Sequence, residues 1–149
     1  FAHRGITREI HTTGNADGMK KTLEVARQKF TGLCFVNLVD FDMKYGHRRD
    51  IAGYAQAVME LDRFLQDLYK ILGEDDCMIV TADHGCDPGH IGTDHTREYV
   101  PVLIAGKKIH PVSLGTRSSF ADLGKTCTEL LGADASALAG TSFCGAIVS

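Results

Sequence analysis

The chain has 149 residues, which is enough for one domain with a hydrophobic core. Hydrophobic residues make up 44% of it and charged residues 23%, an ordinary globular composition. The net charge of -3 gives no electrostatic footprint for nucleic acid or an anionic membrane. No apolar run approaches the roughly 18–20 residues that a membrane-spanning helix needs.

No signal peptide is visible, because no basic segment precedes an apolar one. The five cysteines are scattered and odd in number, so we expect reduced thiols in a cytoplasmic protein. The sequence begins at Phe1, without an initiator methionine and within a polar segment. We therefore expect it to be a piece of a longer protein.

The first predicted helix follows a loop or short strand over residues 1–17. Asn15 or Asp17 can cap this helix, and Gly32 ends it. Its apolar residues recur at the spacing of three to four that places them on one helix face: Met19, Leu23, Ala26 and Phe30.

Two buried strands and a long helix come next. Residues 34–41 are nearly all apolar without alternation, which is typical of a strand buried on both faces of a parallel sheet. Asp50 can cap an amphipathic helix that runs to Gly73, and residues 78–82 form the second strand. Strand, helix and strand predict a βαβ unit with a right-handed crossover.

The rest of the chain completes one predicted α/β domain over residues 1–149. A loop over 85–98 is long enough to be functional, and residues 100–105 form a third strand. Ser119 and Asp122 predict a capping box for a helix that Gly132 ends. The last 17 residues carry no assignable pattern.

Acids and imidazoles gather where the predicted strands end. Asp42 and Asp83 each follow a strand, and the carboxyl ends of parallel strands meet at one sheet edge. His47, His84 and His95 lie close to them in the sequence or arrive on the long loop. Two carboxylates and three imidazoles suit two Mn²⁺ or Zn²⁺ ions, an arrangement used in phosphoryl chemistry. Spacing alone leaves open that these are solvated acids and hydrogen-bonded histidines.

Several strings of this sequence resemble the phosphopentomutases (phosphodeoxyribomutases) of the alkaline phosphatase superfamily. The more specific strings are Tyr-Gly-His-Arg-Arg-Asp at 45–50 and Gly-Thr-Asp-His-Thr-Arg-Glu at 92–98. Thr-Ala-Asp-His-Gly at 81–85 is shared by the wider superfamily, and residues 1–7 and 15–19 add to the likeness. The resemblance implies a doubly wound, mostly parallel sheet with helices on both faces, of which this chain is the C-terminal part.

The resemblance also implies a site with two Mn²⁺ ions. Asp42, His47 and His95 would hold one ion, and Asp83 and His84 would belong to the other. An N-terminal aspartate, the threonine that carries the phosphoryl group, and a cap domain have no counterpart here. The parent enzyme would interconvert ribose 1-phosphate and ribose 5-phosphate, and the 2-deoxy sugars, primed by a bisphosphorylated sugar. The chain alone is expected to be inactive.

Basic residues near the predicted ligands are candidates for binding phosphate. Lys44, Arg48 and Arg97 have this position, with solvated surface cations as the alternative. Arg48 and Arg49 precede a helix start, where the helix dipole disfavours cations and an adjacent anion would relieve the cost.

Other polar residues near the predicted site are expected to support it rather than bind metal. We expect Asp40 to be a structural hydrogen-bond acceptor. We expect Asp87 and Asp94 to orient the loop or a histidine. Cys86 is not expected to be a ligand, since a thiolate suits Zn²⁺ better than Mn²⁺.

Two alternatives stay open. One is another member of the superfamily, such as a cofactor-independent phosphoglycerate mutase or a phosphatase. The other is a non-catalytic metal-binding domain. Oligomeric state is not predicted.

Overall fold

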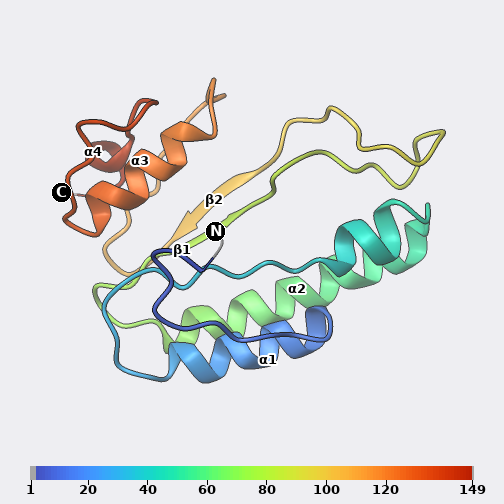
Figure 1. The fold of residues 1–149 in the computed structure, drawn as a ribbon, viewed down its shortest axis with the longest axis horizontal. Helices are drawn as coiled ribbons and strands as arrows, with labels where there is room; N and C mark the ends of the chain where they lie inside the picture. The colour runs from blue at the N-terminus through green and yellow to red at the C-terminus, as the bar shows by residue number, and fades with distance from the viewer. Residues whose placement is uncertain (1–2, 149) are drawn as a thin grey trace. The chain divides into compact units, whose positions relative to one another are not determined.

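The computed structural model describes residues 3–148. It contains helices and two strands, so the predicted α/β class is confirmed (Figure 1). The chain divides into two compact units. The first comprises the chain up to Lys29 with Phe35–Ile71 and Thr81–Pro101, and the second comprises Phe30–Cys34, Leu72–Val80 and the chain from Val102 onward. A single domain over 1–149 stays a prediction.

Helix α1 of the first unit spans Asn15–Ala26 and confirms the first predicted helix, although it ends well before Gly32. Asn15 is its first residue rather than its cap. The Asn15 backbone N–H donates to Asp40 Oδ2 at 2.9 Å, and the Asp40 N–H donates to Asn15 Oδ1 at 3.0 Å. Asp40 is therefore the structural acceptor that the sequence predicts.

The long helix α2 spans Ile51–Ile71 and begins as predicted. The Gly53 N–H donates to Asp50 Oδ1 at 2.8 Å, which is the hydrogen bond of an N-cap. Near this end Tyr54 meets the ring of Phe41 edge to face, with centroids 5.5 Å apart. The contact ties the start of α2 to the segment that precedes it.

The predicted strand over 34–41 is wrong. Most of this segment is irregular, and from Asp40 it becomes helical, with the π-helix η1 over Phe41–Gly46. Phe35 is 72% exposed where a strand buried on both faces was expected. The sheet that the structure describes is made of β1 and β2, and this segment is not one of its strands. The predicted βαβ unit is accordingly absent from residues 3–148.

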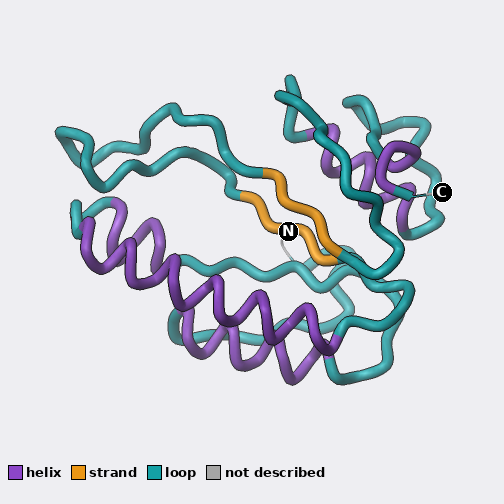
Figure 2. The backbone as a smooth tube through the Cα atoms, turned by 180° about the vertical axis from the view of Figure 1, so that it is seen from behind, coloured by secondary structure: helices purple, strands orange, loops and turns teal. Residues whose placement is uncertain are grey.

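The sheet has two strands. Strands β1, Met78–Thr81, and β2, Val102–Ala105, confirm the other two predicted strands and pair with each other. Figure 2 shows them side by side as the two arms of a hairpin, so they run antiparallel. An isolated antiparallel bridge joins Gly85 and Thr96 within the loop that connects the two strands.

Two helices complete the second unit. Helix α3 spans Ala121–Leu130, and the short helix α4 spans Cys144–Ile147 in the stretch that carried no assignable pattern. Phe143 and Ile147 are buried, at 5% and 1% exposed, and belong to the core of this unit. The predicted capping box is wrong: the N-cap of α3 is Phe120, without a side-chain cap bond, and the Asp122 carboxylate accepts instead from Arg117 and Thr141.

No helix among residues 3–148 has the length and apolarity needed to cross a membrane.

Candidate metal centre

The π-helix η1 brings two predicted ligands to the same side of the chain. Asp42 and His47 are five positions apart, which in an α-helix would separate them by about 140°. The His47 N–H instead donates to the Asp42 carbonyl at 2.9 Å, the i to i+5 bond of a π-turn. Such turns are rare in proteins, and those that occur are often found at functional sites. The sequence suggested a folded-back loop here, and the structure supplies a wide helical turn.

Gly46 allows this turn to approach the long loop. It is buried, and a Cβ added there would overlap Cys86 Sγ and lie 2.9 Å from the Phe41 carbonyl oxygen. Burial raises the pKa of the Cys86 thiol, and its hydrogen bond with the Asp42 carboxylate raises it further. Both effects disfavour the thiolate, which is the form of cysteine that binds metal.

The loop that carries His84 and His95 is closed by its own backbone. The Thr96 N–H donates to the Gly85 carbonyl at 2.9 Å, and a Cβ at Gly85 would lie 2.8 Å from the Glu98 nitrogen. Gly85 is thus needed for close approach. The Asp87 N–H donates to Thr96 Oγ1 at 2.8 Å, and the Asp87 carboxylate accepts from the Gly89 N–H at 2.7 Å.

Arg49 fastens the same loop to the start of α2. Its Nη1 donates to the Asp87 carbonyl at 2.6 Å and its Nη2 to the Asp94 carbonyl at 2.9 Å. Its Nε donates to the Gly92 carbonyl. The guanidinium therefore donates to protein carbonyls, a role for which no pattern in the sequence is a signal.

Three imidazole nitrogens surround one oxygen of Asp42. Asp42 Oδ1 lies 3.3 Å from His47 Nε2, 3.4 Å from His95 Nε2 and 3.9 Å from His84 Nε2. This oxygen is buried and has no hydrogen-bond partner among residues 3–148. A buried carboxylate oxygen that faces nitrogens without a hydrogen bond is costly unless a cation lies between them.

The imidazole rings are turned so that their Nε2 atoms face Asp42. His47 Nδ1 contacts the Thr93 carbonyl, and His84 Nδ1 lies 3.1 Å from the Gly85 carbonyl. A carbonyl oxygen only accepts, so Nδ1 is the donor in each contact, and in a neutral ring of this tautomer Nε2 carries the lone pair that a metal would use. This is how metal-binding histidines are commonly held. The His84 and His95 rings stack with centroids 3.7 Å apart.

The donor set fits a divalent cation. One ligand atom from each of Asp42, His47 and His95 lies within 4.8 Å of the others. Ligands about 2.1 Å from a tetrahedral ion would lie about 3.4 Å from one another. One carboxylate and two imidazoles leave further coordination positions free for substrate or water.

Asp83 and His84 lie outside that group of three. The Asp83 side chain is 86% exposed, with Oδ1 3.6 Å from His84 Nε2. They adjoin the group through His84, which also approaches Asp42. The structure therefore places all five predicted ligands in one region of the first unit and gathers three of them closely.

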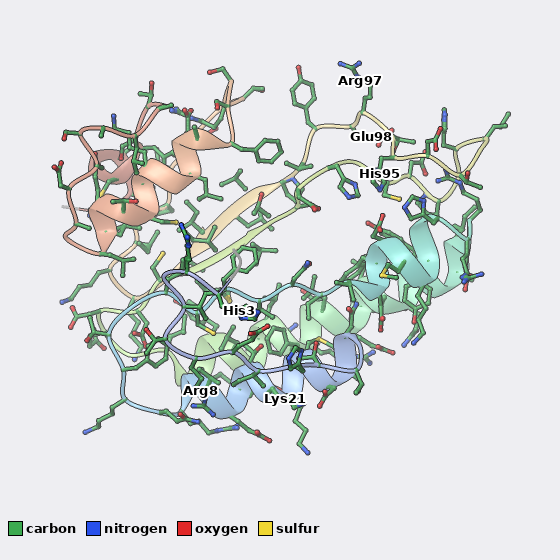
Figure 3. The ribbon with its side chains drawn as sticks, viewed as in Figure 1. His3, Arg8, Lys21, His95, Arg97 and Glu98 are labelled. Atoms are coloured by element: carbon green, nitrogen blue, oxygen red, sulfur yellow. The ribbon has the colours of Figure 1, made fainter. Side chains whose placement is uncertain are left out.

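The candidate phosphate-binding residues are more dispersed. Lys44 is 63% exposed, with Nζ 3.6 Å from Asp40 Oδ2. Arg48 is exposed, and Figure 3 shows Arg97 pointing away from His95. Their role stays a prediction.

The family to which the chain belongs follows from comparison with known proteins. The metalloenzyme superfamily matches residues 2–135, and the chain belongs to this superfamily. The match confirms the expected fold class, a part of an α/β core of the alkaline phosphatase type.

Individual proteins of this superfamily are similar to the chain over most of its length. The chain is 54% identical to a phosphopentomutase of Acetivibrio thermocellus over 149 residues, which are 99% of this chain and 38% of that protein. It is 56% identical to a phosphopentomutase of Symbiobacterium thermophilum over 133 residues, 89% of this chain and 34% of that protein. A phosphopentomutase of Desulfitobacterium hafniense is 50% identical over 149 residues, which are 99% of this chain and 38% of that protein. The chain spans about a third of the length of these relatives.

Proposed function

We propose that Asp42, His47 and His95 bind one divalent cation, and that Asp83 and His84 contribute to a second. The observation that carries the proposal is the buried Asp42 oxygen with three imidazole Nε2 atoms turned toward it. The exposure of Asp83 supports a second site that further ligands, outside these 149 residues, would complete.

Mn²⁺ is the proposed metal, because the ligands are oxygen and nitrogen atoms, and the raised pKa of the nearby Cys86 thiol disfavours a thiolate ligand. When bound, two such ions offset the negative charge of a phosphoryl group during transfer. Other residues of the chain orient the proposed ligands. The Thr93 and Gly85 carbonyls hold the His47 and His84 rings.

The complete protein is proposed to be a phosphopentomutase. It would interconvert ribose 1-phosphate and ribose 5-phosphate, and their 2-deoxy forms, in nucleoside catabolism. Support comes from relatives of that name at 50–56% identity. The phosphorylated threonine would come from a part of the protein outside this chain, and a bisphosphorylated sugar would prime it. The five free thiols favour a reducing compartment such as the cytoplasm.

The test uses the complete protein with Mn²⁺ and ribose 1-phosphate, followed by ³¹P NMR. We expect ribose 5-phosphate to form, and the variants Asp42→Ala and His95→Ala to lose most of the turnover. The 149-residue chain alone is expected to give no product. Interconversion of phosphoglycerates without any conversion of pentose phosphates would overturn the assignment in favour of the sister mutase.

A further inference from the structure

Arg49 occupies an unusual backbone position between η1 and α2. Its φ is 56°, in the left-handed region that non-glycine residues seldom adopt. A long side chain held there is strained, and strain of this kind persists where surrounding contacts fix it. The hydrogen bonds of the Arg49 side chain fix this backbone conformation.

Arg49 and His47 together bind three consecutive carbonyls of the long loop. Arg49 Nε donates to Gly92, His47 Nδ1 to Thr93, and Arg49 Nη2 to Asp94, with the last bond at 2.9 Å. His95 is the next residue along the chain. One arginine thus holds the peptide that orients His47 and delivers His95.

A further bond fixes the other arm of the same loop. Arg49 Nη1 donates to the Asp87 carbonyl at 2.6 Å. The guanidinium therefore spans from residue 87 to residue 94, which lie on the two sides of the loop tip. A planar fork with donors on three nitrogens can satisfy this arrangement, and a lysine ammonium cannot match its geometry.

We propose that Arg49 is a positioning residue for the metal centre, one that sets the loop so that His47 and His95 both face Asp42. The inference rests on the proposed metal-binding function. In this role Arg49 acts on the metal ligands through the loop that it binds, and it does not contact the substrate phosphate.

The first test compares Arg49→Lys with the wild-type protein and with Arg63→Lys, an exposed arginine on α2. Zn²⁺ serves as the probe in calorimetric titrations, since it binds such ligands more tightly than Mn²⁺. Arg49→Lys keeps the charge and is expected to weaken Zn²⁺ binding about 10- to 100-fold, the usual cost of losing a residue that orients a ligand. Arg63→Lys is expected to bind Zn²⁺ like the wild type.

The second measurement separates this inference from metal binding itself. In the absence of metal, we expect Arg49→Lys to raise amide hydrogen exchange over residues 92–96 and to shift the ¹⁵N resonances of the His47 ring. If the wild type binds no Zn²⁺, the proposed function fails for this chain, while these two signals still decide the role of Arg49. Wild-type Zn²⁺ affinity in Arg49→Lys, or unchanged exchange and ring signals, would overturn the inference.

A second variant covers the case in which Arg49→Lys does not fold. Arg49→Gly accepts the positive φ without strain and removes all three loop bonds. It is expected to fold and to show the same loss of Zn²⁺ affinity and the same rise in exchange.

Discussion

The two units each contain an aspartate that is partly or fully enclosed, and the two side chains differ in their partners. In the second unit Asp122 is 3% exposed and accepts from Arg117 Nε at 2.9 Å and from the Thr141 N–H at 2.8 Å. In the first unit Asp42 Oδ1 has no hydrogen-bond donor among residues 3–148. Three imidazole nitrogens surround it at 3.3 to 3.9 Å.

This difference separates a carboxylate that stabilises the fold from one kept for a ligand. A buried charge that is fully hydrogen-bonded holds its surroundings together, and removing its partners is costly. A buried oxygen without a donor works against folding. Under the proposed function, a divalent cation would neutralise the Asp42 oxygen of the first unit, whereas the second unit uses the same residue type as a structural link.

The largest expected effect is on metal binding by the first unit. Asp42→Asn removes the charge and one ligand oxygen, so we expect Zn²⁺ affinity to fall by about 100-fold or more. Because the lost oxygen had no donor, the urea midpoint of the metal-free protein should not fall. Calorimetry and urea unfolding measure the two quantities. A clear loss of stability with unchanged Zn²⁺ affinity would reverse the roles assigned to the two aspartates.

Asp122→Asn should give the opposite pattern. It weakens the pairing with Arg117, so the unfolding temperature at pH 7 is expected to fall by several degrees while Zn²⁺ affinity stays at the wild-type value. Thermal unfolding followed by circular dichroism, with calorimetry at 25 °C, tests both expectations. Loss of metal binding in this variant would show that the second unit controls the site.

The same variant carries a pH signature. The Thr141 N–H, helped by Arg117, holds the pKa of Asp122 below its ordinary value of 3.8. A lowered folded-state pKa gives stability that is present above that ordinary value and is lost as the pH falls through the folded-state pKa. The difference in unfolding temperature between wild type and Asp122→Asn should therefore shrink as the pH falls below about 4. A constant difference between pH 7 and pH 3 would contradict this cause.

A smaller effect should rank the histidines of the first unit. His95 Nε2 lies 3.4 Å from Asp42 Oδ1 and belongs to the group of three, while His84 Nε2 lies 3.9 Å away. We expect His95→Gln to weaken the first Zn²⁺ binding step about tenfold more than His84→Gln. Equal effects would mean that one ion uses all three imidazoles.

The helices were predictable because their signals are local. Asp50 caps α2 as its position in the sequence suggested, and the stripe of apolar residues marks the helix that follows. Strand pairing depends on other parts of the chain. Residues 34–41 have the composition of a central strand, yet the sheet that the structure describes pairs β1 with β2, and Phe35 is 72% exposed.

The sequence predicts which residues form the candidate site, but it does not predict how they are arranged. Asp42, His47 and His95 followed from residue type and from resemblance, and the structure brings them together. The π-turn that aligns Asp42 with His47 has no simple sequence pattern, because it differs from an α-turn by a single added residue. The role of Arg49 was also hidden, since its partners are backbone carbonyls more than 35 positions away.

The smallest expected effect tests whether burial, rather than distance, distinguishes the structural carboxylate. Lys108 Nζ lies 2.6 Å from Asp75 Oδ1 in the second unit, closer than Arg117 Nη2 lies to Asp122, at 2.8 Å. Both partners of the closer pair are exposed, at 64% and 86%, so water competes for each charge and little stability results. Lys108→Met is expected to leave the unfolding temperature within experimental error of the wild type. If it lowered that temperature as much as Asp122→Asn does, the shorter ion pair would matter more than the buried one, and burial could not explain why Asp122 stabilises its unit.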